Sequence, residues 1–246
     1  MEMMIVAEMG SCWNPEDSLA SCMSLVEAAA DAGADAIKMQ DWAPIKEMNR
    51  DDEWKEQCAP WTIVPGTLRE IKSYARWHKL EFLCSVFTMD AITRAVRLRY
   101  PAIKIASSEI RNLALLARMG RLNVPFWLST GEAGKGYKVV ERALDALNAR
   151  DVTLLHCVAE YPAADANLGR MQKLAQRFPR CSVGWSSHVA YPAAVAVAAE
   201  AARQGATVIE AHLRMKGVTP KNAPDNGAWS LFPSELAEVA EAVRNV

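Results

Sequence analysis

Eight short apolar runs recur along the whole chain, and a stretch with helical periodicity follows each of them. The runs are too continuously hydrophobic for a half-exposed antiparallel sheet, and they are typical of parallel strands buried on both faces. They cover residues 3–9, 34–40, 81–87, 102–108, 124–130, 152–158, 181–188 and 207–213. Short connections join most of these units, so the pattern predicts an α/β fold, a (β/α)8 TIM barrel that spans residues 1–246 as a single domain.

One connection is much longer than the others. It lies between the second strand and the next helix, where residues 41–65 hold Trp42, Trp54, Trp61 and a charged patch. The clearest helical signals lie outside it, at residues 18–33, 137–149 and 233–246. Connections of this length usually have a function, so we expect a lid over the barrel mouth, with a packed excursion over the same mouth as the alternative.

The composition excludes several classes of protein. With 51% hydrophobic residues, 23% charged residues and a net charge of -1, the chain has no basic excess for nucleic acid or a membrane surface. It has no apolar stretch of roughly 18 residues, and no basic segment precedes its first apolar run. Six cysteines lack regular spacing, and Cys84, Cys157 and Cys181 fall in apolar runs, which indicates reduced thiols. We expect a cytoplasmic protein without nucleic-acid or membrane partners.

Polar residues gather at the carboxyl ends of the predicted strands, where barrels of this kind carry their chemistry. Side chains alternate along a strand, so Lys38 and Gln40 share one face, as do Glu210 and His212, and both pairs should point into the barrel. The rim residues are Glu8, Lys38, Gln40, Ser85, Lys104, Ser107, Glu109, Ser129, Thr130, His156, Ser186, Ser187, His188, Glu210 and His212.

Two features of this rim point to chemistry. His188 and His212 end neighbouring strands, about 5 Å apart at the backbone, which suits one divalent metal. Lys38 and Lys104 would be buried, which costs several kcal/mol unless they meet carboxylates or a bound anion. The alternative for the lysines is that they form structural ion pairs with nearby carboxylates, and the alternative for the histidines is that they are hydrogen-bonded residues of the core. His156 fits a structural role and a pocket role equally well.

Motifs along the whole chain resemble those of the N-acetylneuraminate (sialic acid) synthase family, which includes legionaminate and pseudaminate synthases. The motifs are AEMG (7–10), AGADAIKMQ (32–40), KIASSEI (104–110), LSTGEA (128–133), LLHCVAEYP (154–162), VGWSSH (183–188), VIEAH (208–212) and PDNGAWSLFPSEL (224–236). The resemblance implies a metal-dependent condensation of phosphoenolpyruvate (PEP) with an aldehyde, an open-chain sugar or a related compound. The products would be a 2-keto-3-deoxy acid and phosphate.

The resemblance also implies a role for each matching residue. His188 and His212 would bind the metal, for which Mn2+ is the best candidate, although Mg2+, Co2+ or Zn2+ could also bind. The residues expected around PEP are Lys38, Ser85, Lys104, Ser107, Ser129, Tyr161 and Ser186. The residues expected to act on the metal, its water and the sugar are Glu8, Gln40, Glu210 and Asp225.

The chain also departs from the family pattern, mostly on the sugar side. Ser187 replaces an aspartate, Cys12 and Trp13 replace an Asn-His pair, Ala159 replaces an asparagine and Ala211 a basic residue. The resemblance covers the barrel only, without the family's C-terminal antifreeze-like domain, and it allows a homodimer. We therefore expect an acceptor other than N-acetylmannosamine, with Trp13 and the aromatic connection contacting it. Two alternatives are a metal-dependent aldolase or lyase that does not use PEP, and a catalytically silent ligand-binding homologue.

Overall fold

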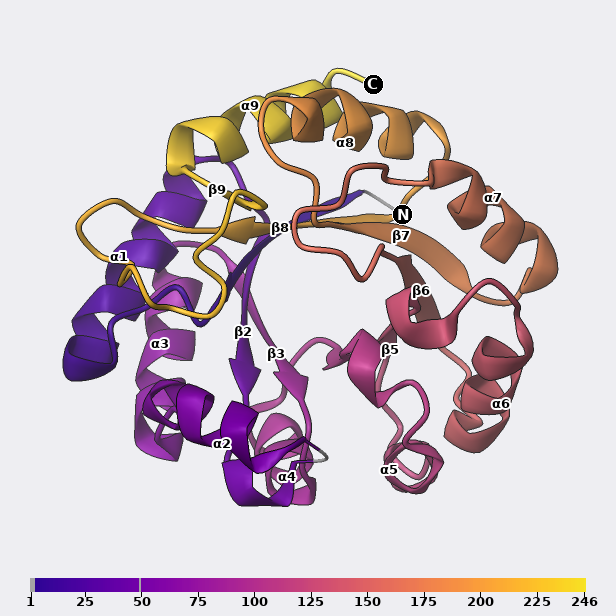
Figure 1. Cartoon of the computed structure of the whole chain (residues 1–246), viewed down its shortest axis with the longest axis horizontal. Coiled ribbons are helices and arrows are strands. Elements are labelled where there is room, and N and C mark those ends of the chain that lie inside the picture. The colour runs from indigo at the N-terminus through magenta and orange to yellow at the C-terminus, as the bar shows by residue number, and fades with distance from the viewer. Residues whose placement is uncertain (1–2, 49) are drawn as a thin grey trace.

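The structure is a computed structural model that describes residues 3–48 and 50–246. Eight parallel strands pair in chain order, and the first pairs with the eighth, which closes a barrel (Figure 1). The strands are β1 (Met4–Gly10), β2 (Ala36–Asp41), β3 (Glu81–Val86), β4 (Ile103–Ile105), β5 (Phe126–Ser129), β6 (Val152–His156), β7 (Ser182–Ser187) and β8 (Val208–Leu213). The predicted (β/α)8 TIM barrel is confirmed.

Helices surround the strands on the outside of the barrel (Figure 1). They are α1 (Ser18–Asp31), α3 (Pro65–Trp77), α4 (Met89–Leu98), α5 (Leu113–Met119), α6 (Lys138–Leu147), α7 (Leu168–Arg177), α8 (Ala193–Arg203) and α9 (Pro233–Arg244). A further short helix, α2 (Asp52–Cys58), lies in the long β2–α3 connection. Side-chain caps fix several of their starts: the Thr88 hydroxyl accepts from the Ala91 amide at α4, and Asn112 accepts from Leu115 at α5.

The interior of the barrel changes from apolar to polar halfway along the strands. A separate apolar cluster fills its amino-terminal half, made of Val6, Ala36, Leu83, Ala102, Trp127, Leu155 and Val208. Two residues further along the chain from each of these seven, the same face carries Glu8, Lys38, Ser85, Lys104, Ser129, Cys157 and Glu210. Because side chains alternate with period two, this step places the polar residues in one layer above an apolar floor.

Two local features differ from the sequence-based expectation. The strand predicted at 102–108 covers only Ile103–Ile105, because the chain turns into a 3-10 helix at Ser107–Glu109. This turn buries Glu109 against Asn112, which donates to its carboxylate at 2.9 Å, so Glu109 does not reach the cavity. An additional two-residue strand, β9 (Ser230–Leu231), pairs with the end of β8 and was not predicted.

In the described part of the chain, no helix is long and apolar enough to cross a membrane. All six cysteines are free thiols, and five of them are buried. Trp127 and Trp185 are buried in the core, as expected for tryptophans within strands.

Candidate active site

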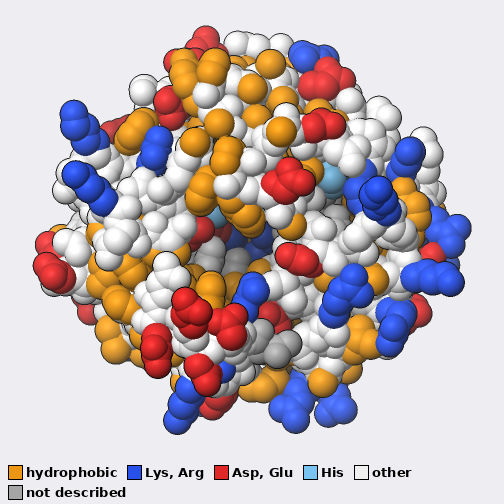
Figure 2. All heavy atoms as spheres, viewed as in Figure 1, with side chains coloured by type: hydrophobic (Ala, Val, Ile, Leu, Met, Phe, Trp, Pro, Cys, Tyr) orange, Lys and Arg blue, Asp and Glu red, His pale blue; other side chains and the backbone are white. Residues whose placement is uncertain are grey.

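The carboxyl end of the barrel holds a cavity of about 450 Å³. The space-filling view shows this face hollowed at its centre, with basic, acidic and histidine side chains inside the hollow (Figure 2). All of the site residues predicted from the sequence line it: Glu8, Lys38, Gln40, Ser85, Lys104, Ser107, Ser129, Tyr161, Ser186, His188, Glu210, His212 and Asp225. The cavity therefore brings together residues from seven of the eight barrel strands and from the segments that follow β4, β6, β7 and β8.

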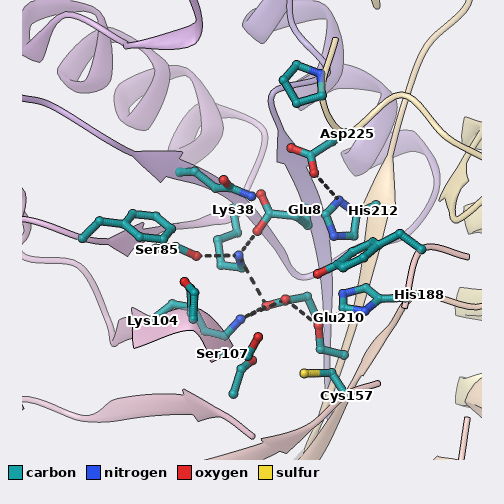
Figure 3. A pocket seen from close by; sticks show the side chains of 18 of the residues that line it. Glu8, Lys38, Ser85, Lys104, Ser107, Cys157, His188, Glu210, His212 and Asp225 are labelled. Atoms are coloured by element: carbon teal, nitrogen blue, oxygen red, sulfur yellow. Dashed lines mark hydrogen bonds and ion pairs between the residues drawn. The ribbon is translucent and has the colours of Figure 1, made fainter. Parts of the chain in front are cut away.

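A network of buried charges occupies the bottom of the cavity (Figure 3). The Lys38 ammonium contacts the Glu8 carboxylate, lies 3.6 Å from Glu210 and donates to the Ser85 hydroxyl at 3.0 Å. The Lys104 ammonium donates to both Glu210 oxygens, at 3.0 and 3.3 Å. Each lysine thus meets a carboxylate, which explains how both remain buried.

Glu210 is the centre of this network. Burial would raise the pKa of its carboxyl group, but Lys104 and Lys38 outweigh burial and hold that pKa well below the usual range. The Ser186 hydroxyl also donates to Glu210 at 2.8 Å. Glu210 is consequently ionised and holds both ammonium groups on one side of the cavity.

The two predicted metal ligands, His188 and His212, lie beside each other, across this network from Ser85 (Figure 3). The ring centroids of His188 and His212 are 5.7 Å apart. Burial lowers the pKa of His188 to about 4 and also lowers the pKa of His212, so both imidazoles are neutral at physiological pH. His188 Nδ1 is hydrogen-bonded to the Val158 carbonyl at 2.5 Å, which leaves Nε2 as its available ring nitrogen.

Asp225 lies next to His212, with its Oδ1 3.8 Å from His212 Nδ1. Its other oxygen accepts from both the amide and the hydroxyl of Ser11, each at 2.8 Å. The Asp225 amide donates in return to the Ser11 hydroxyl at 2.9 Å. This reciprocal pair fixes the loop after β8 to the end of β1. No local pattern singled out Ser11 in the sequence, because its partner lies 214 residues away.

Gly10→Ala is expected to lower both the thermal stability and the activity of the protein. Gly10 has a φ of 45°, where an L-residue costs about 1–2 kcal/mol, and a Cβ there would collide with the Asp225 carboxylate. The matched control is Gly66→Ala in the first turn of α3, where a Cβ would meet no atom within 4 Å. Thermal unfolding gives the Tm of both variants, and steady-state kinetics gives their activity. If Gly10→Ala has the same Tm and activity as Gly66→Ala, the prediction is wrong.

The cavity lining also contains residues that were not among the predicted site residues. Ala106, Ser108, Glu132 and Cys157 line the cavity between the predicted residues, and burial raises the pKa of the Cys157 thiol. Trp42, Met48, Arg50, Trp54, Phe87, Pro224 and Trp229 line its outer part. The period-two alternation predicts Cys157, since it is two residues beyond Leu155. Trp42 and Trp54 belong to the aromatic connection that the sequence analysis expected at the mouth, whereas the other outer residues lie on irregular segments without such a signal.

The structure places two further residues that the sequence analysis discussed, His156 and Trp13. His156 is buried outside the cavity, and its Nε2 is hydrogen-bonded to the Ala166 carbonyl at 2.8 Å, so it has a structural role. Trp13 does not line the cavity, contrary to expectation. It is 2% exposed, and its indole N–H donates to the Gly10 carbonyl at 3.1 Å.

A closed (β/α)8 barrel with buried lysines, carboxylates and two adjacent histidines at the carboxyl ends of its strands defines a barrel enzyme. Sequence comparison identifies the family: residues 25–246 match the NeuB family, and the chain belongs to it. This membership places the chain among the synthases that use PEP.

Individual relatives agree with this assignment. The chain is 31% identical to an N,N'-diacetyllegionaminic acid synthase of Campylobacter jejuni, over 99% of this chain and 76% of that protein. It is 32% identical to the spore coat polysaccharide biosynthesis protein SpsE of Bacillus subtilis, over 98% of this chain and 66% of the relative.

Solved structures show the same fold. An N-acetylneuraminic acid (sialic acid) synthetase from Leptospira borgpetersenii, crystallised with citrate, superposes with a TM-score of 0.87 at 24% identity. That match covers 100% of this chain and 84% of the other. The structure of Bacillus subtilis SpsE superposes with a TM-score of 0.83 at 30% identity, over 99% of this chain and 68% of that chain.

Proposed function

We propose that the protein condenses PEP with the aldehyde of an open-chain sugar or a related compound, in a reaction that depends on a divalent metal. The products are a 2-keto-3-deoxy acid and inorganic phosphate. The observation that carries this proposal is the arrangement of Lys38, Glu210 and Lys104 beside His188 and His212 in one cavity. Membership of the NeuB family supports the use of PEP and a sugar-type acceptor.

The lysines and hydroxyl groups are suited to PEP. Its phosphate and carboxylate are strong acceptors, and ammonium and hydroxyl donors at charge-assisted distances are their natural partners. The proposed PEP contacts are Lys38, Ser85, Lys104, Ser107, Ser129, Tyr161 and Ser186. Lys38 and Lys104 are already balanced by Glu8 and Glu210, so a multiply charged anion needs further positive charge in the cavity.

The residues beside the lysines fit a divalent ion. His212 Nδ1 is buried and has no hydrogen-bond partner among the described residues, and both imidazoles are neutral, as metal ligands must be. Across residues 3–48 and 50–246, no group of three or more His, Cys, Asp or Glu side chains forms a ligand cluster. His188 and His212 would therefore hold the ion together with water and substrate oxygens, and Mn2+ suits such a set best.

When bound, the ion would supply Lewis-acid activation of the acceptor aldehyde. In the reaction, C3 of PEP forms a bond to the aldehyde carbon, whose C=O π bond opens so that its oxygen takes up a proton and becomes a hydroxyl group, and water adds to C2 of the former PEP. The tetrahedral intermediate then breaks its C2–O bond to phosphate, which leaves the 2-keto acid. Glu210 or Asp225 accepts the proton of the attacking water, since both carboxylates line the cavity. Lys38 and Lys104 hold the PEP anion in place, and Glu8 and Gln40, which line the same cavity, would contact the acceptor and a water bound to the ion.

Phosphate release from PEP tests the proposal directly. With Mn2+ present, we expect release that depends on one class of aldehyde in a panel of N-acetylmannosamine, D-arabinose and D-erythrose. The keto acid product should appear in equal amount. If no aldehyde releases phosphate, or if an aldehyde turns over without consuming PEP, the proposal is wrong, and the second result would favour an aldolase or lyase.

A further inference from the structure

Described residues of the long β2–α3 connection, α2 included, form the outer wall of the cavity. Trp42 and Trp54 from this segment line the cavity and pack edge to face, with ring centroids 5.3 Å apart. The Arg50 guanidinium lies over the Trp54 ring, 5.4 Å from its centroid. Arg50 is exposed at the mouth, whereas Lys38 and Lys104 are buried at the bottom. We call Trp42, Arg50 and Trp54 the outer wall.

A buried ion pair fixes the start of this segment. Asp41 is fully buried, and Arg94 of α4 donates to its two oxygens from Nε at 2.8 Å and from Nη2 at 2.7 Å. Arg94 Nη2 also donates to the Ala43 carbonyl at 2.5 Å, and the Thr88 hydroxyl donates to the same carbonyl at 2.8 Å. Bidentate pairs of this kind fix orientation as well as distance. The proposed reaction gives neither Asp41 nor Arg94 a role, and neither lines the cavity.

The far end of the connection is attached as well. Trp61 is buried, and its indole N–H donates to the Trp13 carbonyl at 3.0 Å, while Trp13 in turn is bonded to Gly10 at the end of β1. Contacts at both ends favour a fixed wall over the mobile lid that the length of the connection suggests.

We propose that the outer wall binds the acceptor aldehyde and that Asp41 and Arg94 are positioning residues that hold it in place. The inference rests on the proposed function, because it assigns the acceptor's part of the same cavity. The rings offer flat apolar faces for the carbon chain of a polyhydroxylated acceptor, and the guanidinium offers several donors for its hydroxyl groups. None of the proposed PEP contacts belongs to the outer wall. Breaking the Asp41–Arg94 pair therefore weakens acceptor binding and leaves PEP binding intact.

The variants Asp41→Asn and Arg94→Gln test this inference. With the aldehyde of the panel that gives the fastest phosphate release, we expect the acceptor KM to rise by about tenfold, since small displacements of a positioning element have effects of this size. The KM and the calorimetric Kd for PEP should change by less than about twofold. The matched control is Arg177→Gln, which breaks a surface ion pair between α7 and Glu141 of α6 (2.6 Å) far from the cavity lining.

Two milder variants keep the test decisive if these proteins fold poorly. Thr88→Val removes one bond to the Ala43 carbonyl, and Trp54→Ala removes part of the wall itself, so both should raise the acceptor KM alone. Equal increases in KM for acceptor and PEP, or an unchanged acceptor KM, would overturn the inference and leave the proposed function standing. Absence of phosphate release by the unaltered protein with every aldehyde would instead reject the proposed function, and this inference with it.

Discussion

Lys104→Met is expected to lower kcat/KM for PEP by about 100- to 1,000-fold, the range found when one donor to a reacting anion is removed. The Lys104 ammonium is buried and bonds both oxygens of Glu210, whereas the neighbouring Lys38 ammonium is already in contact with Glu8. Steady-state phosphate release gives kcat/KM, and calorimetric titration with PEP in the presence of Mn2+ separates binding from turnover.

Loss of stability has to be distinguished from loss of binding in this variant. Removing one partner of a buried ion pair costs roughly 3–5 kcal/mol, because the other charge is left uncompensated. The double variant Lys104→Met/Glu210→Gln removes both charges of the pair, so it should recover Tm without recovering PEP affinity. Glu210→Gln alone should retain PEP binding but lose turnover. Lys173→Met on the exposed face of α7 is the matched control. If Lys104→Met binds PEP as tightly as the unaltered protein, Lys104 is not a PEP ligand.

His212→Ala is expected to weaken Mn2+ binding by at least about 100-fold and to reduce phosphate release to near background. The described residues place two imidazoles at this position and no cluster of three ligating side chains, so one of two protein ligands is lost. Calorimetry or electron paramagnetic resonance with Mn2+ alone measures the affinity without requiring turnover.

His156→Ala is the control for this prediction. His156 is also a buried histidine at a strand end, but it bonds the Ala166 carbonyl and lies outside the cavity. We expect a lower Tm with unchanged Mn2+ affinity. An unchanged Mn2+ affinity in His212→Ala would show that the ion binds elsewhere or not at all.

Alternation along strands made much of the site predictable. Lys38 and Gln40 line the cavity together, as do Glu210 and His212, because each pair is two residues apart on a regular strand. The same periodicity predicts the barrel itself. What it does not give is the register between strands, and the contact of Lys38 with Glu8 depends on their being directly opposite in the β1–β2 ladder.

Irregular segments account for most of what was not predicted. The 3-10 turn after β4 sends Ser107 into the cavity and Glu109 away from it, although both lie in one polar run of sequence. The outer wall depends on the pairing of Asp41 with Arg94, residues 53 apart in sequence, and neither local propensity nor periodicity records such contacts. Contacts between residues far apart in the sequence determine the structure of such loops, so a local sequence pattern does not predict it.

The apolar floor beneath the lysines has a kinetic consequence. Because this layer fills the amino-terminal half of the barrel, the described residues leave the cavity mouth that the outer wall borders as the route to the lysines. An acceptor bound there would lie across the route to the deeper site. Addition is therefore expected to be ordered, with PEP entering first, and free acceptor in excess should act as a substrate inhibitor by occupying the empty enzyme.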